Sequence, residues 1–254
     1  MDCTAKIRSL FDYRLFPALF EWVGEDYNAD SDFVAELISL QEAIYMLDDK
    51  LESNWEIADS DLEQEWEYIR KNLQVIKGDS VDVEDYLKLI KNYQSRELAL
   101  RMPDQSGFNN DFIEFYYTKS CDVKLIRRLI YEKYRDLYNF VPLEAWDSFD
   151  LITEINDDVV DLKEDLSSLN GNRLLYSIYK VGKYDTKEIF TKYLKDIERK
   201  ILNDNKIDIG IVDMKSICLK NICETLEQLQ KNLSIFTEQE LLSSNLIKRL
   251  QLAV

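Results

Sequence analysis

Acidic side chains are concentrated in one short stretch of the chain, ITEINDDVVDLKEDL at positions 152 to 166. Five carboxylates fall within nine consecutive positions, namely Asp157, Asp158, Asp161, Glu164 and Asp165. The spacing of the apolar residues around them predicts a helix. Like charges three and four positions apart on a helix repel each other. Either a bound cation offsets this repulsion, or the stretch is simply a solvated face.

A helical projection places these acids on one side of the predicted helix, and a second acidic helix end occurs upstream. Together with Glu154, the acids share an arc of roughly 120°, and the opposite arc is apolar. In the upstream helix, Asp48 and Glu52 lie one turn apart and Asp49 lies at the edge of the same face. Two such clusters that face each other would form a Mg²⁺ site, because hard divalent cations prefer carboxylate oxygens.

The composition removes several other kinds of chemistry. The chain has no histidine, which excludes Ser-His and Cys-His nucleophilic schemes and zinc sites with imidazole ligands. Its four cysteines show no paired spacing, so we expect buried free thiols rather than a disulfide framework or a zinc site. Carboxylate, Tyr, Lys and Arg chemistry remains.

The charge balance limits the partners that the chain can bind. With 32 basic and 49 acidic side chains the net charge is −17, which argues against nucleic acid and anionic membranes. An anionic substrate remains compatible if metal cations mediate the contact. The N-terminus has no signal pattern and no apolar run is long enough to span a membrane. We therefore expect a cytoplasmic protein without stable membrane insertion.

The distribution of apolar residues predicts an all-α fold. Only six Gly and three Pro occur in 254 residues, which favours long helices joined by short links. The periodicity predicts about ten helices, no strand and a single domain over residues 1–254. The fragment KIDIGIVDM, 206–214, is predicted to be a loop, and Asp30 or Ser31 is the expected cap of the second helix. The helices are expected near 4–23, 31–54, 60–77, 81–101, 109–139, 143–168, 173–181, 185–203, 213–235 and 237–252.

The upstream acidic helix end resembles a known motif. The segment YMLDDKLE is similar to the first aspartate-rich motif of class I isoprenoid synthases, in which an apolar helix ends in Asp-Asp-x-x-Asp/Glu. Asp48, Asp49 and Glu52 match that motif.

The second acidic stretch resembles the second metal-binding motif of the same superfamily in three ways. DDVVD, 157–161, resembles the Asp-Asp-x-x-Asp of prenyl diphosphate synthases, and DLKED, 161–165, resembles the Asp-x-x-Glu-Asp of squalene and phytoene synthases. Asp157, Asp161 and Asp165 also resemble the metal-binding triad of terpene cyclases. The resemblance covers roughly residues 10 to 200 and leaves the subfamily open.

The resemblance implies a fold and an activity. The fold would be a single bundle of antiparallel helices around a central apolar cavity. The activity would be that of a Mg²⁺-dependent terpene synthase, which ionises an allylic prenyl diphosphate and cyclises the carbocation. A prenyltransferase, which joins the carbocation to a second substrate, is the alternative, and a homodimer is left open. Three Mg²⁺ ions would hold the diphosphate through Asp48, Asp49, Glu52, Asp157, Asp158, Asp161 and Asp165.

A bound diphosphate also requires cationic donors. Lys119 and Arg127 share one side of a predicted helix, and Arg173 follows the segment NGN at 170–172. Tyr45, on the first motif's helix, is an aromatic candidate for stabilising a carbocation. For these side chains, surface ion pairs and core packing are the alternative interpretations.

Two other functions compete with the isoprenoid synthase interpretation. All-helical nucleotide pyrophosphatases also bind Mg²⁺ through acidic helices, but Glu36 and Glu42 do not have their Glu-Glu-x-x-Glu spacing. A non-enzymatic acidic helical binding protein, such as an immunity protein that occludes a basic partner, fits the net charge equally well. The discriminating feature is whether the two acidic faces meet across an apolar cavity.

Overall fold

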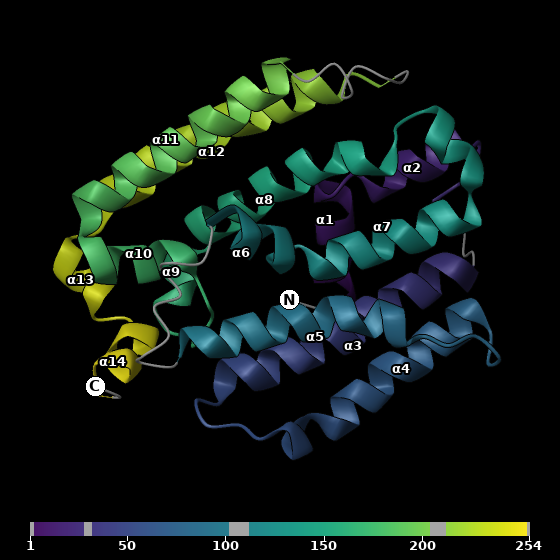
Figure 1. Ribbon diagram of the computed structural model, residues 1–254, viewed down its shortest axis with the longest axis horizontal. Coiled ribbons are helices and arrows are strands. Elements are labelled where there is room, and N and C mark those ends of the chain that lie inside the picture. Colours follow the sequence, from purple (N-terminus) through teal and green to yellow (C-terminus); the bar gives the residue numbers. More distant parts are fainter. Residues whose placement is uncertain (1–2, 28–31, 102–111, 204–211, 253–254) are drawn as a thin grey trace. The chain divides into compact units, whose positions relative to one another are not determined.

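The chain is all-helical, as its periodicity predicts. The computed structural model describes residues 3–27, 32–101, 112–203 and 212–252 (Figure 1). Helices account for 83% of the described residues, well above the third that is usual for soluble proteins. The described residues contain no β-strand. None of the helices in these ranges combines the length and the apolar composition needed to cross a membrane.

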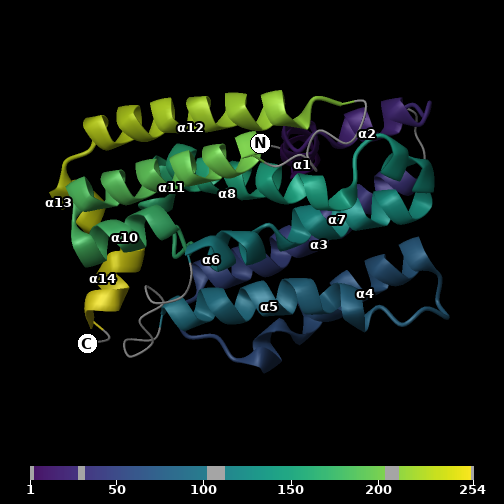
Figure 2. The same ribbon diagram turned by 45° about the horizontal axis from the view of Figure 1, so that its top comes forward.

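The chain divides into two compact units. The first unit comprises residues 1–94 and 121–140. The α3 and α4 helices lie side by side in it and are joined by η1 (Figures 1 and 2). Its elements are α1 (Cys3–Tyr13), α2 (Phe16–Trp22), α3 (Asp32–Ser53), η1 (Asp59–Leu62), α4 (Glu63–Lys77), most of α5 (Glu84–Leu100), α7 (Cys121–Lys133) and η2 (Arg135–Asn139).

The second unit comprises residues 95–120 and 141–254. In it, α12 packs along both α8 and α11, and α11 and α12 run in opposite directions (Figure 2). Its elements are the end of α5, α6 (Phe112–Lys119), η3 (Leu143–Ala145), α8 (Trp146–Val160), α9 (Leu162–Asp165), α10 (Arg173–Val181), α11 (Lys183–Asn203), α12 (Met214–Ile235), α13 (Glu238–Leu242) and α14 (Asn245–Leu252).

The expected number of about ten helices is wrong, because several predicted helices are interrupted. The described residues form fourteen α-helices. The segment predicted at 4–23 breaks at Leu15, a non-glycine residue with a left-handed φ of 61°. Pro17 does not kink a helix but lies in the first turn of α2, where a missing N–H group costs nothing.

Three further predicted helices are divided without any glycine or proline at the break. The segment at 109–139 becomes α6, α7 and η2, and 143–168 becomes η3, α8 and α9 with the break at Asp161. The segment at 237–252 becomes α13 and α14. The loop predicted at 206–214 falls mostly outside the described residues, as do the expected caps Asp30 and Ser31.

Packing against α12 determines which face of α8 is available for chemistry. The apolar residues of α8 are buried, among them Phe149, Ile152, Ile155 and Val159. The side-chain amide of Asn232 on α12 donates to the Val159 carbonyl at 2.6 Å. The α8 helix also contacts α6 and α10, and its Asp158 side chain accepts hydrogen bonds from both of these helices.

Candidate functional site

The six acids of the second motif differ strongly in burial. Glu154, Asp158 and Asp165 are buried, with exposed fractions of 4%, 1% and 4%. Asp157 is half-buried, whereas Asp161 and Glu164 are exposed. The acidic arc is therefore not a uniformly solvated face. One edge of it is enclosed by protein and the other edge is open to solvent.

The Asp158 carboxylate is held by donors from α6 and α10. Its Oδ1 accepts a hydrogen bond from the Lys119 ammonium group. Its Oδ2 accepts from the Tyr116 hydroxyl at 2.6 Å and from the backbone N–H of Arg173 at 2.7 Å. Since charge-assisted hydrogen bonds are the strong ones, this carboxylate ties α6, α8 and the start of α10 together.

Asp165 is held by the two asparagines of the NGN segment. The Asn172 amide donates to Asp165 Oδ2 at 2.7 Å and also to the Asp158 carbonyl oxygen at 2.8 Å. The Asn170 amide donates to Asp165 Oδ1 at 3.0 Å. The Asn172 oxygen in turn accepts from the backbone N–H of Leu175, so Asn172 is the N-cap of α10. We call Tyr116, Lys119, Asp158, Asp165 and Asn172 the polar cluster.

Asp161 lies at the junction between α8 and α9, beside the polar cluster. Its N–H donates to the Asp157 carbonyl at 2.8 Å, and its carbonyl accepts from the Asp165 N–H at 2.9 Å. Partial burial raises the pKa of Asp161 to about 6, and the charges of Asp157, Asp165 and Glu164 add to the rise. The proton on Asp161 is therefore held more tightly because of lost hydration and the repulsion of neighbouring carboxylates.

Electrostatic interactions in the polar cluster favour a charged lysine and a neutral tyrosine. Burial by itself lowers the pKa of Lys119, but the carboxylates of Asp158 and Glu154 outweigh it and hold the pKa above its ordinary value. Burial and the Asp158 charge raise the pKa of Tyr116 well above its usual range. Burial also raises the pKa of Asp165, although the hydrogen bond from Asn172 offsets part of that rise.

The predicted diphosphate donors are distributed over both units. Lys119 belongs to the polar cluster. Arg173 contributes its backbone N–H to Asp158, and its buried guanidinium lies over the rings of Phe115 and Tyr176, with centroid distances of 5.4 and 5.2 Å. Burial lowers the pKa of Arg173. Arg173 thus packs among aromatic rings at the edge of the cluster.

Arg127 belongs to the first unit. It is buried, it donates to the Arg14 carbonyl at 3.2 Å, and its guanidinium lies 5.3 Å from the centroid of the Phe16 ring. In the same unit, the Gln41 amide donates to the Asp122 carboxylate at 2.8 Å. These contacts link α7 to Arg14, to Phe16 of α2 and to Gln41 of α3.

The first acidic motif also lies in the first unit, at the end of α3. Asp48 and Glu52 are half-buried and Asp49 is exposed. Tyr45 is half-buried as well, and the Lys6 ammonium lies 5.3 Å from the centroid of its ring. The hypothesis that these acids face the second motif across an apolar cavity stays a prediction.

The donor chemistry of the second motif fits a hard divalent cation in part. Asp157, Asp161 and Asp165 supply the oxygen donors that Mg²⁺ prefers, and their mutual repulsion favours a bound cation. Asp158 and Asp165 fit less well than the other two, because Lys119 and Tyr116 occupy the oxygens of Asp158 and Asn170 and Asn172 occupy those of Asp165. Within the described ranges, no three Cys, Asp or Glu side chains are already arranged to hold a metal ion.

Two functional side chains of the polar cluster were not predicted from the sequence. Tyr116 is not among the candidates that the sequence indicates, although it lies three positions before Lys119 and so shares its helix face. Asn172 was interpreted as part of a link, although asparagine directly before a helical segment is a strong N-cap signal.

Comparison with family models, with curated proteins and with solved structures finds no match to this chain.

Proposed function

We propose that this protein is a Mg²⁺-dependent class I terpene synthase that ionises an allylic prenyl diphosphate. The observation that carries the proposal is the raised pKa of Asp161, which partial burial and the crowding of Asp157 and Asp165 bring to about 6. Carboxylates that are crowded and partly desolvated favour a bound cation, since the cation offsets both the repulsion and the lost hydration.

Two accessible acids and one buried acid of the arc are the proposed ligands. Asp157 and Asp161 are reachable from solvent, and Asp165 follows one turn later. Asp48, Asp49 and Glu52 of the first motif are the other proposed metal ligands. Their assignment rests on the motif resemblance. Bound Mg²⁺ would neutralise the charge of the diphosphate, which is the leaving group of the ionisation.

The buried edge of the arc supplies positioning and positive charge. The Lys119 side chain is 13% exposed, and its ammonium group holds its proton because of Asp158 and Glu154. It therefore stays cationic at neutral pH and can attract a phosphate oxygen. Asp158 orients Lys119, and Tyr116 donates to the same carboxylate. Asn172 fixes the orientation of Asp165 through its amide.

A thermal shift experiment tests the metal and diphosphate part of the proposal. Mg²⁺ and inorganic diphosphate together should stabilise the wild-type protein, because a ligand that binds only the native state raises its stability, by about 2.7 kcal/mol at a hundredfold excess over Kd. Asp161→Asn should respond much less because it loses an anionic ligand. Glu164→Gln, which removes a neighbouring exposed charge outside the proposed ligand set, should respond like wild type.

An assay with substrates tests the reaction itself. The protein is incubated with Mg²⁺ and geranyl, farnesyl or geranylgeranyl diphosphate, and diphosphate release and products are measured by mass spectrometry. A cyclised hydrocarbon supports a terpene synthase, whereas a prenylated acceptor supports the prenyltransferase alternative. If no diphosphate is released and Mg²⁺ plus diphosphate stabilises wild type and Asp161→Asn equally, the enzyme proposal is wrong.

A further inference from the structure

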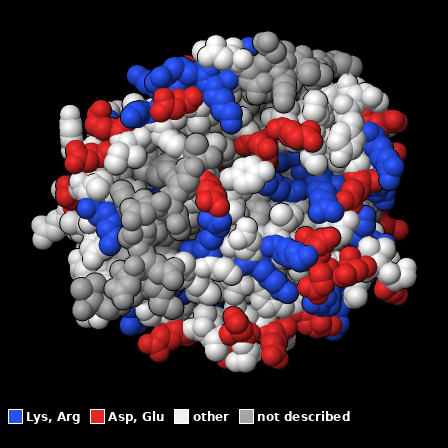
Figure 3. Space-filling view, in the orientation of Figure 1, with Lys and Arg blue, Asp and Glu red and all other residues white. Residues whose placement is uncertain are grey.

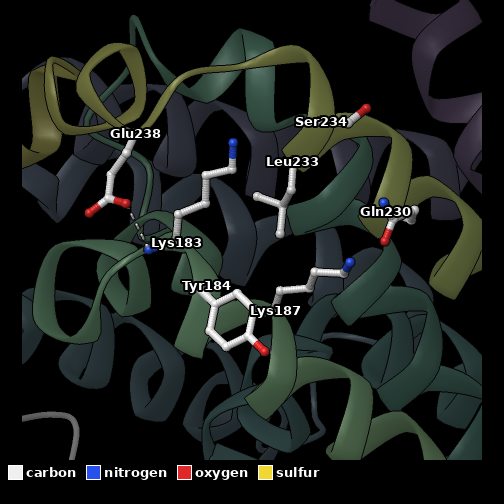
Figure 4. A pocket seen from close by; sticks show the side chains of 7 residues that line it. All are labelled: Lys183, Tyr184, Lys187, Gln230, Leu233, Ser234 and Glu238. Carbon is white, nitrogen blue, oxygen red and sulfur yellow. Dashed lines mark hydrogen bonds between the residues drawn. The ribbon is translucent and has the colours of Figure 1, made fainter.

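The second unit contains a surface groove that the proposed reaction does not use. It lies between α11, α12 and the start of α13 and has a volume of about 450 Å³, within the range typical of small-molecule sites. Figure 4 shows side chains from all three helices around it. The residues that matter for its chemistry are Lys183, Tyr184, Lys187, Gln230, Leu233 and Glu238.

Two of these residues form the frame of the groove. The Lys183 ammonium donates to the Phe236 carbonyl at 2.7 Å, just beyond the end of α12. The backbone N–H of Lys183 donates to Glu238 Oε2 at 3.4 Å, as the dashed line in Figure 4 marks. These contacts connect the start of α11 to the segment between α12 and α13. Lys183 and Glu238 therefore stabilise the walls of the groove.

Two other polar side chains are available for a ligand. Lys187 lies one turn beyond Lys183 on α11 and is half-buried, and its side chain extends toward the α12 side of the groove in Figure 4. Gln230 lines the opposite wall on α12. Neither side chain forms a hydrogen bond or an ion pair with any residue in the described ranges. An ammonium and a carboxamide on facing walls are donors suited to one anionic group.

The charge around the groove differs in sign from that of the whole chain. The helices α11, α12 and α13 together contain nine basic and eight acidic side chains, the two acids of α13 included, whereas the chain has 32 basic and 49 acidic side chains. Figure 3 shows basic side chains in blue and acidic ones in red. This local excess of positive charge favours an anion at the groove, since a local potential raises the concentration of oppositely charged ligands.

The remaining lining is apolar and aromatic. Leu233 is buried, with 2% of its surface exposed, and Tyr184 is 75% exposed. An aromatic ring this exposed has little packing within its own chain. Leu233 and Tyr184 provide apolar surface on α12 and α11, beside the donors of Lys187 and Gln230.

We infer that this groove binds a small organic anion. The anionic group is bound by Lys187 and Gln230, and an aromatic or aliphatic body lies against Tyr184 and Leu233. The groove shares no residue with the polar cluster or with the acidic motifs, so the inference stands whether or not the proposed reaction is correct.

Amide NMR of the full-length, isotope-labelled protein tests the inference with anilinonaphthalene sulfonate as the probe. The probe combines a sulfonate group with a flat apolar body. The neutral phenylnaphthylamine has the same body without the charge. Titrations are carried out on wild type, Lys187→Gln and the control Lys195→Gln, which changes an exposed lysine of α11 outside the groove. The amide spectrum of each variant also verifies that it is folded.

The groove is supported if saturable shifts occur at residues 183–187 and 230–238 and Lys187→Gln weakens binding about fivefold, the effect of losing one partly exposed charge contact. Lys195→Gln should bind like wild type and the neutral probe should bind more weakly. Shifts confined to residues 157–173, no saturable shift at all, or equal affinities for wild type and Lys187→Gln would each overturn the inference.

Discussion

Replacing Lys119 by methionine tests the electrostatic reasoning about the polar cluster. Methionine has a similar length and fits apolar surroundings, so the change removes the charge with little change in packing. The Asp158 side chain has no exposed surface and the Lys119 side chain is 13% exposed. Removing one partner of a buried pair leaves an uncompensated charge, which destabilises a protein by about 3 to 5 kcal/mol.

The remaining donors place the expected effect at the lower end of that range. In Lys119→Met, Asp158 keeps its hydrogen bonds from Tyr116 and from the Arg173 N–H, at 2.6 and 2.7 Å. The expected loss in the free energy of unfolding is therefore about 3 kcal/mol. Asp158→Asn should cost about 2 kcal/mol, because Lys119 can extend its ammonium toward water.

A double-mutant cycle separates the pair from its surroundings. If the two side chains interact, the double variant Lys119→Met/Asp158→Asn should lose about 3 kcal/mol rather than about 5, a coupling of about 2 kcal/mol. Urea unfolding followed by far-UV circular dichroism at neutral pH measures all four proteins. Lys195→Met, an exposed lysine of the same unit, should change stability by less than about 0.5 kcal/mol.

The reasoning fails if Lys119→Met stays within about 0.5 kcal/mol of wild type, or if the cycle shows no coupling above that value. Either result would mean that the carboxylate of Asp158 reaches solvent or is neutral in the folded protein. The cluster would then not hold Lys119 in the charged state on which the proposed phosphate contact depends.

Three further predictions concern the polar cluster and the neighbouring Asp161, and each is measured by urea unfolding. Asp161 has a folded pKa of about 6, above the ordinary value of 3.8, so its protonation stabilises the folded wild type at low pH and this stabilisation is lost as the pH rises. Metal-free Asp161→Asn lacks this loss and should gain stability relative to wild type between about pH 4 and pH 6. A stability difference that is independent of pH would contradict this. Tyr116 has a raised pKa, so wild type should lose stability as pH rises above the ordinary value of 10.0 and Tyr116→Phe should lose less, after a cost of about 1 to 2 kcal/mol at neutral pH for the lost hydrogen bond. Asn172→Ser should cost about 2 kcal/mol because it keeps the N-cap oxygen but loses the amide bonded to Asp165 and to the Asp158 carbonyl, and Asn172→Ala should cost about 1 kcal/mol more; equal losses in the two would mean that the cap contributes nothing.

Local sequence pattern determined the secondary structure of this protein. Helix formation depends on residues three and four positions apart, and that periodicity is visible in the printed sequence. The all-α prediction is confirmed and most predicted helices occur within a few residues of their expected positions. The breaks at Leu15, Ser120 and Asp161 were not predicted. Pro17 follows the first of these breaks, in the opening turn of α2, whereas no glycine or proline marks the other two.

The same pattern located the acidic face of α8 but not the different roles of its members. Asp157 and Asp158 are neighbours and were assigned one role, yet one is half-buried and the other has almost no exposed surface. The difference depends on Lys119, which lies 39 positions earlier in the chain, and on Asn172 and Arg173, which follow a loop. Those contacts form only when α6 and α10 pack against α8.

Tertiary structure alone therefore decided which carboxylates are solvated, which are paired and which have a raised pKa. Desolvation and Coulomb interactions act through space and depend on every neighbouring element, so the spacing of acids along one helix cannot predict them. The types of residue, and hence the kind of cation or substrate that they suit, are determined by the sequence. The order in which those residues release their protons and accept ligands is determined by the fold.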